Sequence, residues 1–357
     1  MKYSTEKVKE YAYLIGVTFR NNVSYEEDLK ELTRLAETAG LEVVGKNGQY
    51  VREITPATLL GSGKLEEIRE EVQKLNANVV VVDYELSGSQ ASNISEILGV
   101  KVIDRMALIL DIFAQRATSN EGMLQVELAQ LKYTLPRLNQ IQGTSGRFGS
   151  AGVGMRGPGE TKLEMDRRAI RLKIQKLEKE IEKIKSQRDL KRQKRSTSGK
   201  KKVAIVGYTN SGKSTLLNAI SKAGIYADDK LFATLETTSR NVWLGDDKQI
   251  ILTDTVGFIN KLPHMLVDAF ASTLEEALDA DLIMHVVDIS NPNFREQIKV
   301  VNDTLKEIGA ENIPEIIAYN KCDKIHEEII LKENEIYISA KTGKNLENLK
   351  ELIKKYI

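Results

Sequence analysis

Strand-like and helix-like patterns alternate over the first hundred residues of the chain. The apolar runs include YAYLIGVTF, LEVVG, NVVVVDYE and VKVID, and the amphipathic stretches between them include EEDLKELTRLAETAG and KLEEIREEVQKLN. This alternation is typical of a parallel sheet covered by helices. We therefore expect an N-terminal parallel α/β domain over residues 1–105.

Two later segments carry apolar residues at spacings of three and four, which predicts helices with one apolar face. The first stripe is Leu124, Leu128, Leu131 and Leu135, and the second is Ile170, Ile174, Leu177, Ile181 and Ile184. Each stripe covers only about two heptads, which is short for a free coiled coil. We expect the two helices to pair as an antiparallel hairpin over residues 106–195.

A glycine-rich segment, residues 143–159, lies between the two stripes and carries the cations Arg147 and Arg156. Its glycine content argues against a helix or an ordinary strand. One interpretation is a flexible hairpin connection. The other is a loop that moulds to a phosphate-rich surface, with both arginines contacting phosphates.

Composition excludes several classes of protein. The chain has one cysteine, Cys322, and three histidines, so it has no intrachain disulfide and a structural zinc site is not expected. No apolar run approaches the roughly 18 residues of a membrane span, and no signal peptide is evident, so we expect a cytoplasmic protein.

The formal net charge is +1, but residues 188–202 are strongly basic. We interpret residues 196–201 as a basic linker before a second domain, residues 202–357.

The second domain opens with a phosphate-binding pattern. GYTNSGKS lies between an apolar strand pattern and a helix pattern, which is the context that such a loop requires. The backbone N–H groups of this loop would surround the phosphates; the loop comprises Gly207, Tyr208, Thr209, Asn210, Ser211 and Gly212. Lys213 would reach the β- and γ-phosphates, and the hydroxyl of Ser214 would ligate Mg²⁺.

A second phosphate-sensing element follows forty residues later. The tetrapeptide Asp254, Thr255, Val256 and Gly257 ends an apolar strand. Asp254 would hold the groups around the Mg²⁺ ion, and the N–H of Gly257 would reach the γ-phosphate. We therefore count Gly257 with Lys213 among the catalytic candidates.

Two further elements predict recognition of guanine. The tetrapeptide Asn320, Lys321, Cys322 and Asp323 follows one strand, and Ser339, Ala340 and Lys341 follow the last strand. The carboxylate of Asp323 can accept two hydrogen bonds from guanine, whereas adenine offers no such donor pair. Asn320 would brace the loop, and Lys321 would lie along the base. These elements favour a GTPase over a metabolic kinase with a phosphate loop.

The threonine that closes over Mg²⁺ is left open by spacing alone, because Thr234, Thr237 and Thr238 are all candidates. Phe258 stands where Ras-like enzymes carry a glutamine that orients the attacking water. We therefore expect slow hydrolysis by the isolated chain.

Another glycine-rich element, GSGK at Gly61–Lys64, looks like the end of a phosphate loop. Thr58 stands where the first glycine is required, and Leu65 stands where the Mg²⁺-binding hydroxyl is required. We interpret Gly61–Lys64 as the entry turn of a helix, with anion binding as the less favoured alternative.

With these residues in view, the chain resembles the HflX family of ribosome-associated GTPases over nearly all of its 357 residues. The carrying segments are ATLLGSGKLEEI, DRMALILDIFAQRA, EGMLQVELAQLKYTLPRL, RGPGETKLEMDRR, GYTNSGKSTLLNAI, LFATLE, DTVGFINKLPH and NKCD. The resemblance implies an N-terminal α/β domain with a helical hairpin, joined to a Ras-like P-loop GTPase domain. It assigns the Mg²⁺ and catalytic threonine to Thr234, within the nucleotide-binding segment Phe232, Ala233, Thr234, Leu235 and Glu236.

The resemblance also implies a partner. It points to the large ribosomal subunit, with the N-terminal domain near rRNA of the peptidyl transferase centre, and to GTP-dependent splitting of stalled or stress-inactivated ribosomes. We expect a monomer when the protein is free. The alternative is a regulatory GTPase whose N-terminal domain binds a protein partner; Arg147 and Arg156 favour RNA.

Overall fold

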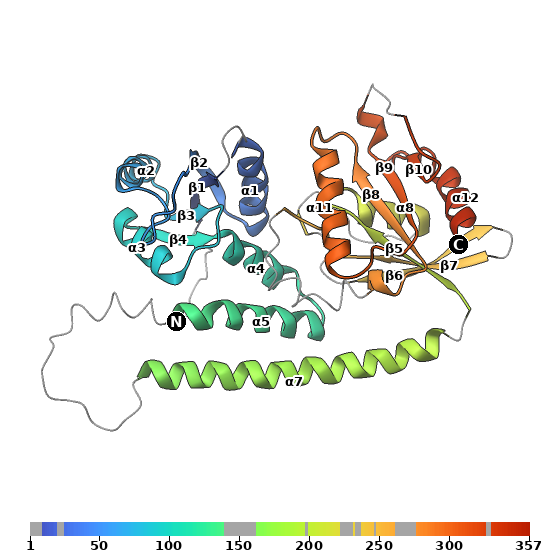
Figure 1. Ribbon diagram of the computed structural model, residues 1–357, viewed down its shortest axis with the longest axis horizontal. Coiled ribbons are helices and arrows are strands. Elements are labelled where there is room, and N and C mark those ends of the chain that lie inside the picture. Colours follow the sequence, from blue (N-terminus) through green and yellow to red (C-terminus); the bar gives the residue numbers. More distant parts are fainter. Residues whose placement is uncertain are drawn as a thin grey trace, which may run out of the picture. The chain divides into compact units, whose positions relative to one another are not determined.

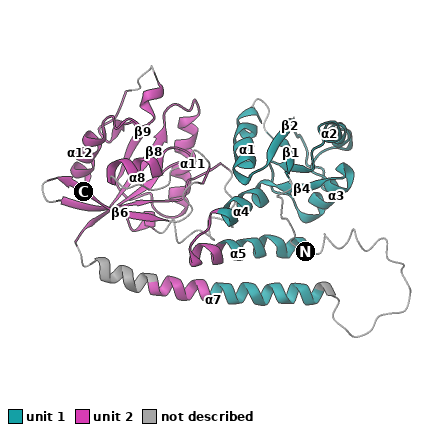
Figure 2. Cartoon of the chain, turned by 180° about the vertical axis from the view of Figure 1, so that it is seen from behind, with its two compact units in different colours: residues 1–115, 126–179 teal, residues 116–125, 180–357 magenta. Residues whose placement is uncertain are grey.

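Two sheets organise the chain, one in each of its two units (Figure 1). The computed structural model describes residues 9–19, 25–138, 162–196, 199–221, 231–232, 237–245, 248–260, 276–325 and 330–357. One unit comprises Met1–Gln115 and Val126–Lys179, and the other comprises Arg116–Gln125 and Glu180–Ile357 (Figure 2).

The first unit is built on four parallel strands in the order β2-β1-β3-β4. They are β1 (Tyr11–Thr18), β2 (Glu42–Tyr50), β3 (Val79–Val82) and β4 (Lys101–Asp104). The helices between them are α1 (Tyr25–Ala39), α2 (Ser62–Lys74) and α3 (Gly88–Leu98). All four valines of β3 are buried, as expected for a strand covered on both faces. The predicted parallel α/β domain is confirmed.

Alternate residues of β1 serve opposite faces of this sheet. Tyr13, Ile15 and Val17 pack into a core with apolar residues of α2 and α3. Gly16 lies on the other face, where a Cβ atom would come within 2.8 Å of the Leu29 side chain of α1. The absence of a side chain at residue 16 therefore lets α1 approach the sheet closely.

A helical segment follows the sheet. It consists of α4 (Arg105–Arg116), α5 (Asn120–Thr134), the 3₁₀ turn η1 (Leu135–Arg137) and α7 (Lys162–Ser196). The parts of α5 and α7 that belong to the first unit run side by side in opposite directions in both views (Figures 1 and 2). Within the first unit they are joined by the ion pairs Lys132–Glu178 at 2.8 Å and Lys173–Glu127 at 2.5 Å. The predicted hairpin is confirmed.

The apolar face of α5 is wider than its predicted stripe. Leu128 is buried, but so are Val126 and Ala129, which lie outside the stripe. The reason is that α5 also faces α4 and the end of β4, so two sides of the helix are covered. On α7 the prediction agrees more closely with the structure, because Ile174 and Leu177 are the buried positions among the side chains described for this helix.

Asp104 fastens this helical segment to the sheet. Its carboxylate is 2% exposed and accepts hydrogen bonds from the N–H groups of Leu86 (3.2 Å) and Ala107 (2.8 Å). It also accepts from the Tyr133 hydroxyl at 2.8 Å and from the Arg137 guanidinium at 3.3 Å. Burial, then the charge of Asp104, raises the pKa of Tyr133. One side chain therefore joins β4, the start of α4 and the end of α5.

The second unit contains six strands in the order β10-β9-β8-β5-β7-β6, with every neighbouring pair parallel except β6–β7. The strands are β5 (Lys201–Val206), β6 (Thr238–Gly245), β7 (Lys248–Asp254), β8 (Leu282–Asp288), β9 (Glu315–Asn320) and β10 (Glu335–Tyr337). The described helical elements include α8 (Lys213–Ser221), α11 (Phe294–Glu307), η3 (Cys322–Lys324) and α12 (Leu346–Tyr356).

Helices cover both faces of the second sheet. Apolar residues of α8 and α12 pack on one face with Val203 and Ile205, and those of α11 pack on the other with Ala204 and Val206. Because β5, β7, β8 and β9 are parallel, their carboxyl ends lie at one edge of the sheet, next to the start of α8. None of the helices in the described part of the chain is long and apolar enough to cross a membrane.

The Asp104 network generates a stability prediction. We expect Asp104→Ala to lower the local unfolding free energy of the first unit by about 2–4 kcal/mol, because Tyr133 and Arg137 would lose a buried acceptor. Amide hydrogen exchange of β3 and β4 in the full chain measures it. The exposed Asp111→Ala serves as the matched control, with an expected change below about 0.5 kcal/mol. Equal protection in both variants would contradict the role of Asp104.

Candidate functional site

Four parallel strands of the second unit end beside one another at the same edge of the sheet (Figure 1). Strand β5 leads into Gly207, β7 ends at Asp254, β8 ends at Asp288 and β9 ends at Asn320. In open α/β sheets this edge is where ligands bind. The predicted phosphate and base motifs therefore come together, although long stretches of sequence separate them.

The loop between β5 and α8 has the backbone shape of a phosphate cradle. Asn210 and Gly212 both have positive φ, at 60° and 95°. A Cβ atom at Gly212 would overlap the side-chain amide of Asn320, so glycine is required by both conformation and space. Helix α8 begins directly afterwards at Lys213, which directs its positive N-terminal dipole at the loop.

The Lys213 side chain is held inside this loop. Its Nζ donates to the carbonyl oxygens of Gly207 at 3.0 Å and Tyr208 at 2.8 Å. An ammonium has three hydrogens, so this arrangement leaves one for a phosphate oxygen. Burial lowers the pKa of Lys213 to about 8, and the charge of Asp254 opposes that fall. An anionic phosphate would supply the missing counter-charge.

Ser214 and Asp254 form a pair of oxygen groups at the loop. The Ser214 hydroxyl donates to Asp254 Oδ2 at 2.7 Å. Because the hydroxyl uses its hydrogen for Asp254, its lone pairs remain suited to a hard cation. Asp254 is 1% exposed, so a carboxylate is held in low dielectric beside the cradle. These residues fit a Mg²⁺ ion that takes its other ligands from phosphates and water.

The segment after Asp254 packs against the phosphate loop. The Thr255 hydroxyl donates to the Ile205 carbonyl at 2.7 Å, which anchors the segment to β5. A Cβ atom at Gly257 would come within 2.8 Å of Thr209 and 3.0 Å of Lys213 Nζ. Val256 is buried next to these residues, and Phe258 is buried among apolar side chains.

Asn320 joins the base motifs to the phosphate loop. Its Nδ2 donates to the Ser211 carbonyl at 2.8 Å, and its Oδ1 accepts from the Ala340 N–H at 2.9 Å.

Lys321 has φ of 64° and donates to the Asn210 carbonyl at 2.8 Å. Lys321 also pairs with Asp288 at 2.7 Å. Sequence reasoning missed Asp288; its one signal was an acidic residue at the end of an apolar strand.

The residues expected to read guanine lie together. Asp323 is exposed, and a hydrogen bond from Ser339 lowers the pKa of its carboxyl group. Cys322 is buried, and its N–H donates to the Ile338 carbonyl at 3.2 Å. Lys341 is exposed in the turn that follows Ala340. The structure thus places a solvent-accessible carboxylate with a lowered pKa three residues after Asn320, whose side chain contacts the phosphate loop.

Some predicted residues lie outside the described part of the chain. They are Arg147, Arg156, Ala233, Thr234, Leu235 and Glu236. Phe232 is described and is buried with φ of 53°. Thr237 and Thr238 are described, and Thr238 begins β6. Thr234 as the threonine that closes over Mg²⁺ stays a prediction.

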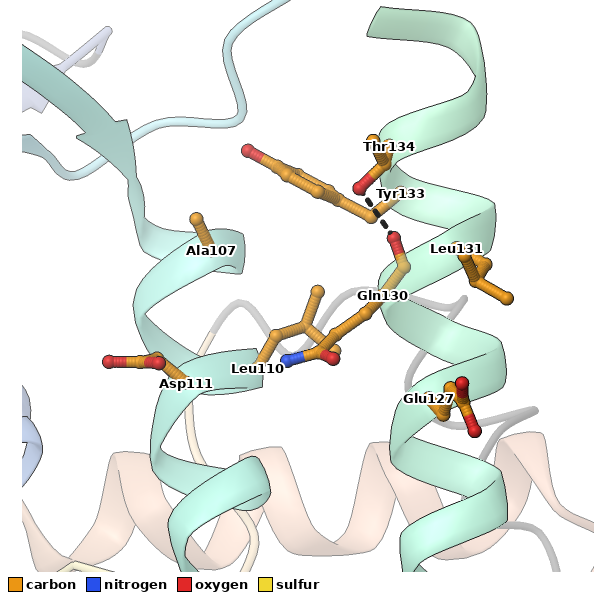
Figure 3. A pocket seen from close by; sticks show the side chains of 8 residues that line it. All are labelled: Ala107, Leu110, Asp111, Glu127, Gln130, Leu131, Tyr133 and Thr134. Atoms are coloured by element: carbon orange, nitrogen blue, oxygen red, sulfur yellow. Dashed lines mark hydrogen bonds between the residues drawn. The ribbon is translucent and has the colours of Figure 1, made fainter. Parts of the chain in front are cut away.

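A separate hollow of about 420 Å³ lies in the first unit between α4 and α5. Figure 3 shows Leu110 and Leu131 beside the carboxylates of Asp111 and Glu127, with the Thr134 hydroxyl donating to the Gln130 carbonyl at 2.7 Å. Two carboxylates would repel a phosphate, so this hollow is unsuited to a nucleotide's phosphates. The GSGK segment forms the entry of α2, with Gly61 as its N-cap, in agreement with the predicted helix entry.

Family models match three consecutive regions of the chain. The model described as "GTP-binding GTPase N-terminal" matches residues 26–114, and "GTP-binding GTPase Middle Region" matches residues 116–195. The model described as "50S ribosome-binding GTPase" matches residues 202–321. The last match spans the phosphate loop, the Asp254 segment and the start of the base motif.

Curated relatives are similar over nearly the whole chain. A GTPase HflX of Caldanaerobacter subterraneus subsp. tengcongensis is 51% identical over 97% of this chain and 80% of the relative. The Escherichia coli GTPase HflX is 42% identical over 95% of this chain and 81% of the relative. A solved GTP-binding protein from Sulfolobus solfataricus, in complex with GDP, is 26% identical with a TM-score of 0.50, over 97% of this chain and 98% of that one. The predicted Ras-like P-loop GTPase fold is confirmed.

The buried amine of Lys213 predicts a pH dependence of nucleotide affinity. Its pKa of about 8 in the nucleotide-free protein must rise when phosphates bind, so binding above that pH requires proton uptake. We expect GDP affinity to be flat below about pH 7.5 and to fall roughly threefold to fourfold between about pH 7 and about pH 8.5. Calorimetry in two buffers of different ionisation enthalpy detects the proton. Proton-free binding at the higher pH would contradict the prediction.

The position of Asp323 predicts base selectivity. We expect Asp323→Asn to weaken GTP binding by roughly 100-fold, because the amide presents donors where guanine also presents donors. Competition of GTP and ATP against a labelled guanine nucleotide measures the effect. The exposed Asp303→Asn on α11 is the control and should leave selectivity unchanged. Equal displacement by ATP and GTP in the unmodified chain would refute the base site.

Proposed function

Since this chain belongs to the HflX family of GTPases, and is itself a GTPase, we propose that it acts on the large ribosomal subunit with its nucleotide state as the switch. The carrying observation is the match of residues 202–321 to the family described as "50S ribosome-binding GTPase". Splitting of stalled or stress-inactivated ribosomes is the finer part of the proposal. A monomer acting in the cytoplasm fits this role.

We further propose specific roles for the residues at the strand ends. The loop Gly207–Ser214 holds the phosphates of GTP, Lys213 meets the β- and γ-phosphates, and Gly257 meets the γ-phosphate through its N–H. Asp323 reads guanine, with Asn320 bracing it and Lys321 along the base. The hydrogen bonds of Lys213 and Asn320 support this assignment, because both side chains are already held in position.

Mg²⁺ would be held by Ser214 and Thr234, with Asp254 fixing the hydroxyl of Ser214. When bound, the ion neutralises charge on the phosphates as the terminal bond breaks. The pairing of Ser214 with Asp254 at 2.7 Å supports this choice of residues. Closure of Thr234 over the γ-phosphate would couple the presence of that phosphate to the conformation of its segment.

Hydrolysis by the isolated chain should be slow. Phe258 occupies the place of a water-orienting residue, and its side chain is apolar and buried. Lys213 and backbone N–H groups stabilise charge but position the attacking water poorly. We propose that docking on the large subunit orders the segments around Thr234 and after Asp254, or supplies the missing group, and so raises kcat.

The N-terminal region would make the rRNA contact near the peptidyl transferase centre. Arg147 and Arg156 in residues 143–159 are suited to phosphates, and the basic linker adds charge. In this proposal residues 1–105 form the N-terminal domain, residues 106–195 the hairpin and residues 202–357 the G domain. The alternative, a protein partner for the N-terminal domain, is an outcome of the test below.

We expect large ribosomal subunits to stimulate GTP hydrolysis by the full chain, and the double variant Arg147→Ala/Arg156→Ala to lose most of that stimulation because two phosphate contacts are removed. The G domain alone, from about residue 198, should not be stimulated. The double variant Arg52→Ala/Arg69→Ala removes two other arginines of the N-terminal region as a matched control.

Multiple-turnover phosphate release, with and without subunits, is the measurement. Equal stimulation of all variants would show that residues 143–159 are only a connection between helices. Absence of stimulation in every variant would favour the protein-partner alternative.

A further inference from the structure

Three hydrogen bonds fasten the start of the phosphate loop to the segment after Asp254. The Thr209 N–H donates to the Phe258 carbonyl at 2.7 Å, and the Phe258 N–H donates to the Gly207 carbonyl at 3.1 Å. The third bond runs from the Asn260 N–H to the hydroxyl of Tyr208 at 2.7 Å. We refer to these three bonds as the clasp.

The first two bonds of the clasp are backbone bonds and need no particular side chain. They form an isolated parallel bridge between Tyr208 and Phe258, beyond the ends of β5 and β7. The third bond depends on a tyrosine, because it reaches the backbone two residues beyond that bridge. Among the described residues, Tyr208 therefore supplies the side-chain contribution to the clasp.

The phosphate-binding pattern itself does not explain this tyrosine. Position 208 is one of the unspecified positions of G-x-x-x-x-G-K-[ST], where only the backbone is needed for the cradle. The Tyr208 side chain is nevertheless 6% exposed. A buried tyrosine hydroxyl normally finds a polar partner, and here the partner is the backbone of the segment that follows Gly257.

Gly257 lies just before the clasp and is packed against two parts of the phosphate loop. A Cβ atom there would come within 2.8 Å of Thr209 and 3.0 Å of Lys213 Nζ. Lys213 is itself held by two loop carbonyls. The clasp therefore sets the separation between Gly257 and the Lys213 ammonium, the two groups assigned above to the γ-phosphate.

We propose that Tyr208 is a positioning residue for GTP. Its hydroxyl holds residues 257–260 in place, so that Gly257 and Lys213 both contact the same γ-phosphate. The inference rests on the proposed roles of Lys213 and Gly257 and adds a residue that the motif does not require. GDP has no γ-phosphate, so its binding uses the loop and Lys213 but not the position of Gly257. The clasp therefore contributes to the affinity for GTP and not to the affinity for GDP.

Tyr208→Phe in the full chain tests the proposal, because it removes one oxygen and keeps the ring. Equilibrium titrations without ribosomes give the affinities for GDP and for a non-hydrolysable GTP analogue, and single-turnover assays give the hydrolysis rate. The ratio of GTP-analogue to GDP affinity is expected to fall roughly 3- to 10-fold, the size of one buried hydrogen bond. The single-turnover rate should fall in the same direction.

Tyr133→Phe is the matched control, because it removes a comparable tyrosine hydroxyl bond, to Asp104 at 2.8 Å, in the first unit. It should leave the ratio of the two affinities unchanged. Lys213→Ala tests the site itself and should weaken both nucleotides. If Lys213→Ala has no effect on either nucleotide, the assignment of the whole site fails, and the positioning role of Tyr208 fails with it.

Three results for Tyr208→Phe would overturn the positioning role while leaving the site intact. An equal loss of affinity for both nucleotides, or no loss, would show that the hydroxyl serves only packing. A gain in affinity for the GTP analogue would show that the clasp opposes the GTP-bound arrangement. Circular dichroism and the thermal unfolding midpoint confirm that the variant is folded before any of these results is interpreted.

Discussion

The side chain of Asn320 holds the candidate nucleotide site together. It ends β9, donates to the Ser211 carbonyl in the phosphate loop and accepts from the Ala340 N–H after β10. One amide therefore fixes the relative position of the phosphate loop and both base-reading elements. Gly212 must lack a Cβ atom for the Asn320 amide to approach. The Lys321 ammonium adds a second side-chain link between the base motif and the phosphate loop, through the Asn210 carbonyl at 2.8 Å.

Short motifs made this site predictable because each depends on local backbone chemistry. A phosphate loop needs glycine at fixed positions next to a strand and a helix, and GYTNSGKS meets that condition while GSGK at Gly61–Lys64 does not. The parallel N-terminal sheet and the helical hairpin were also predictable, because their apolar residues recur at regular spacings. What these patterns share is that the requirement lies within one segment.

Features that depend on contacts between distant segments were not predictable. Asp288 pairs with Lys321 only because β8 and β9 are neighbours, and its sequence context carries no motif. The second buried side of α5, with Val126 and Ala129, depends on its packing in the fold. Similarly, the hydrogen bond between Tyr208 and Asn260 joins residues 52 positions apart. Periodicity reveals that a face is buried, but not how many neighbours a helix has.

The two sheets use the same edge in different ways, and the difference explains where a ligand can bind. At the carboxyl ends of β3 and β4, the buried charges of Asp83 and Asp104 are matched by Arg105 and Arg137 of the same unit. At the corresponding edge of the second sheet, the buried hydroxyls of Thr209 and Ser211 have no hydrogen-bond partner among the described residues. Lys213 there has a lowered pKa because burial outweighs the charge of Asp254. At the first edge the buried carboxylates already have arginine partners, whereas at the second edge a buried ammonium, and hydroxyls without a partner among the described residues, would gain stability if phosphates bound.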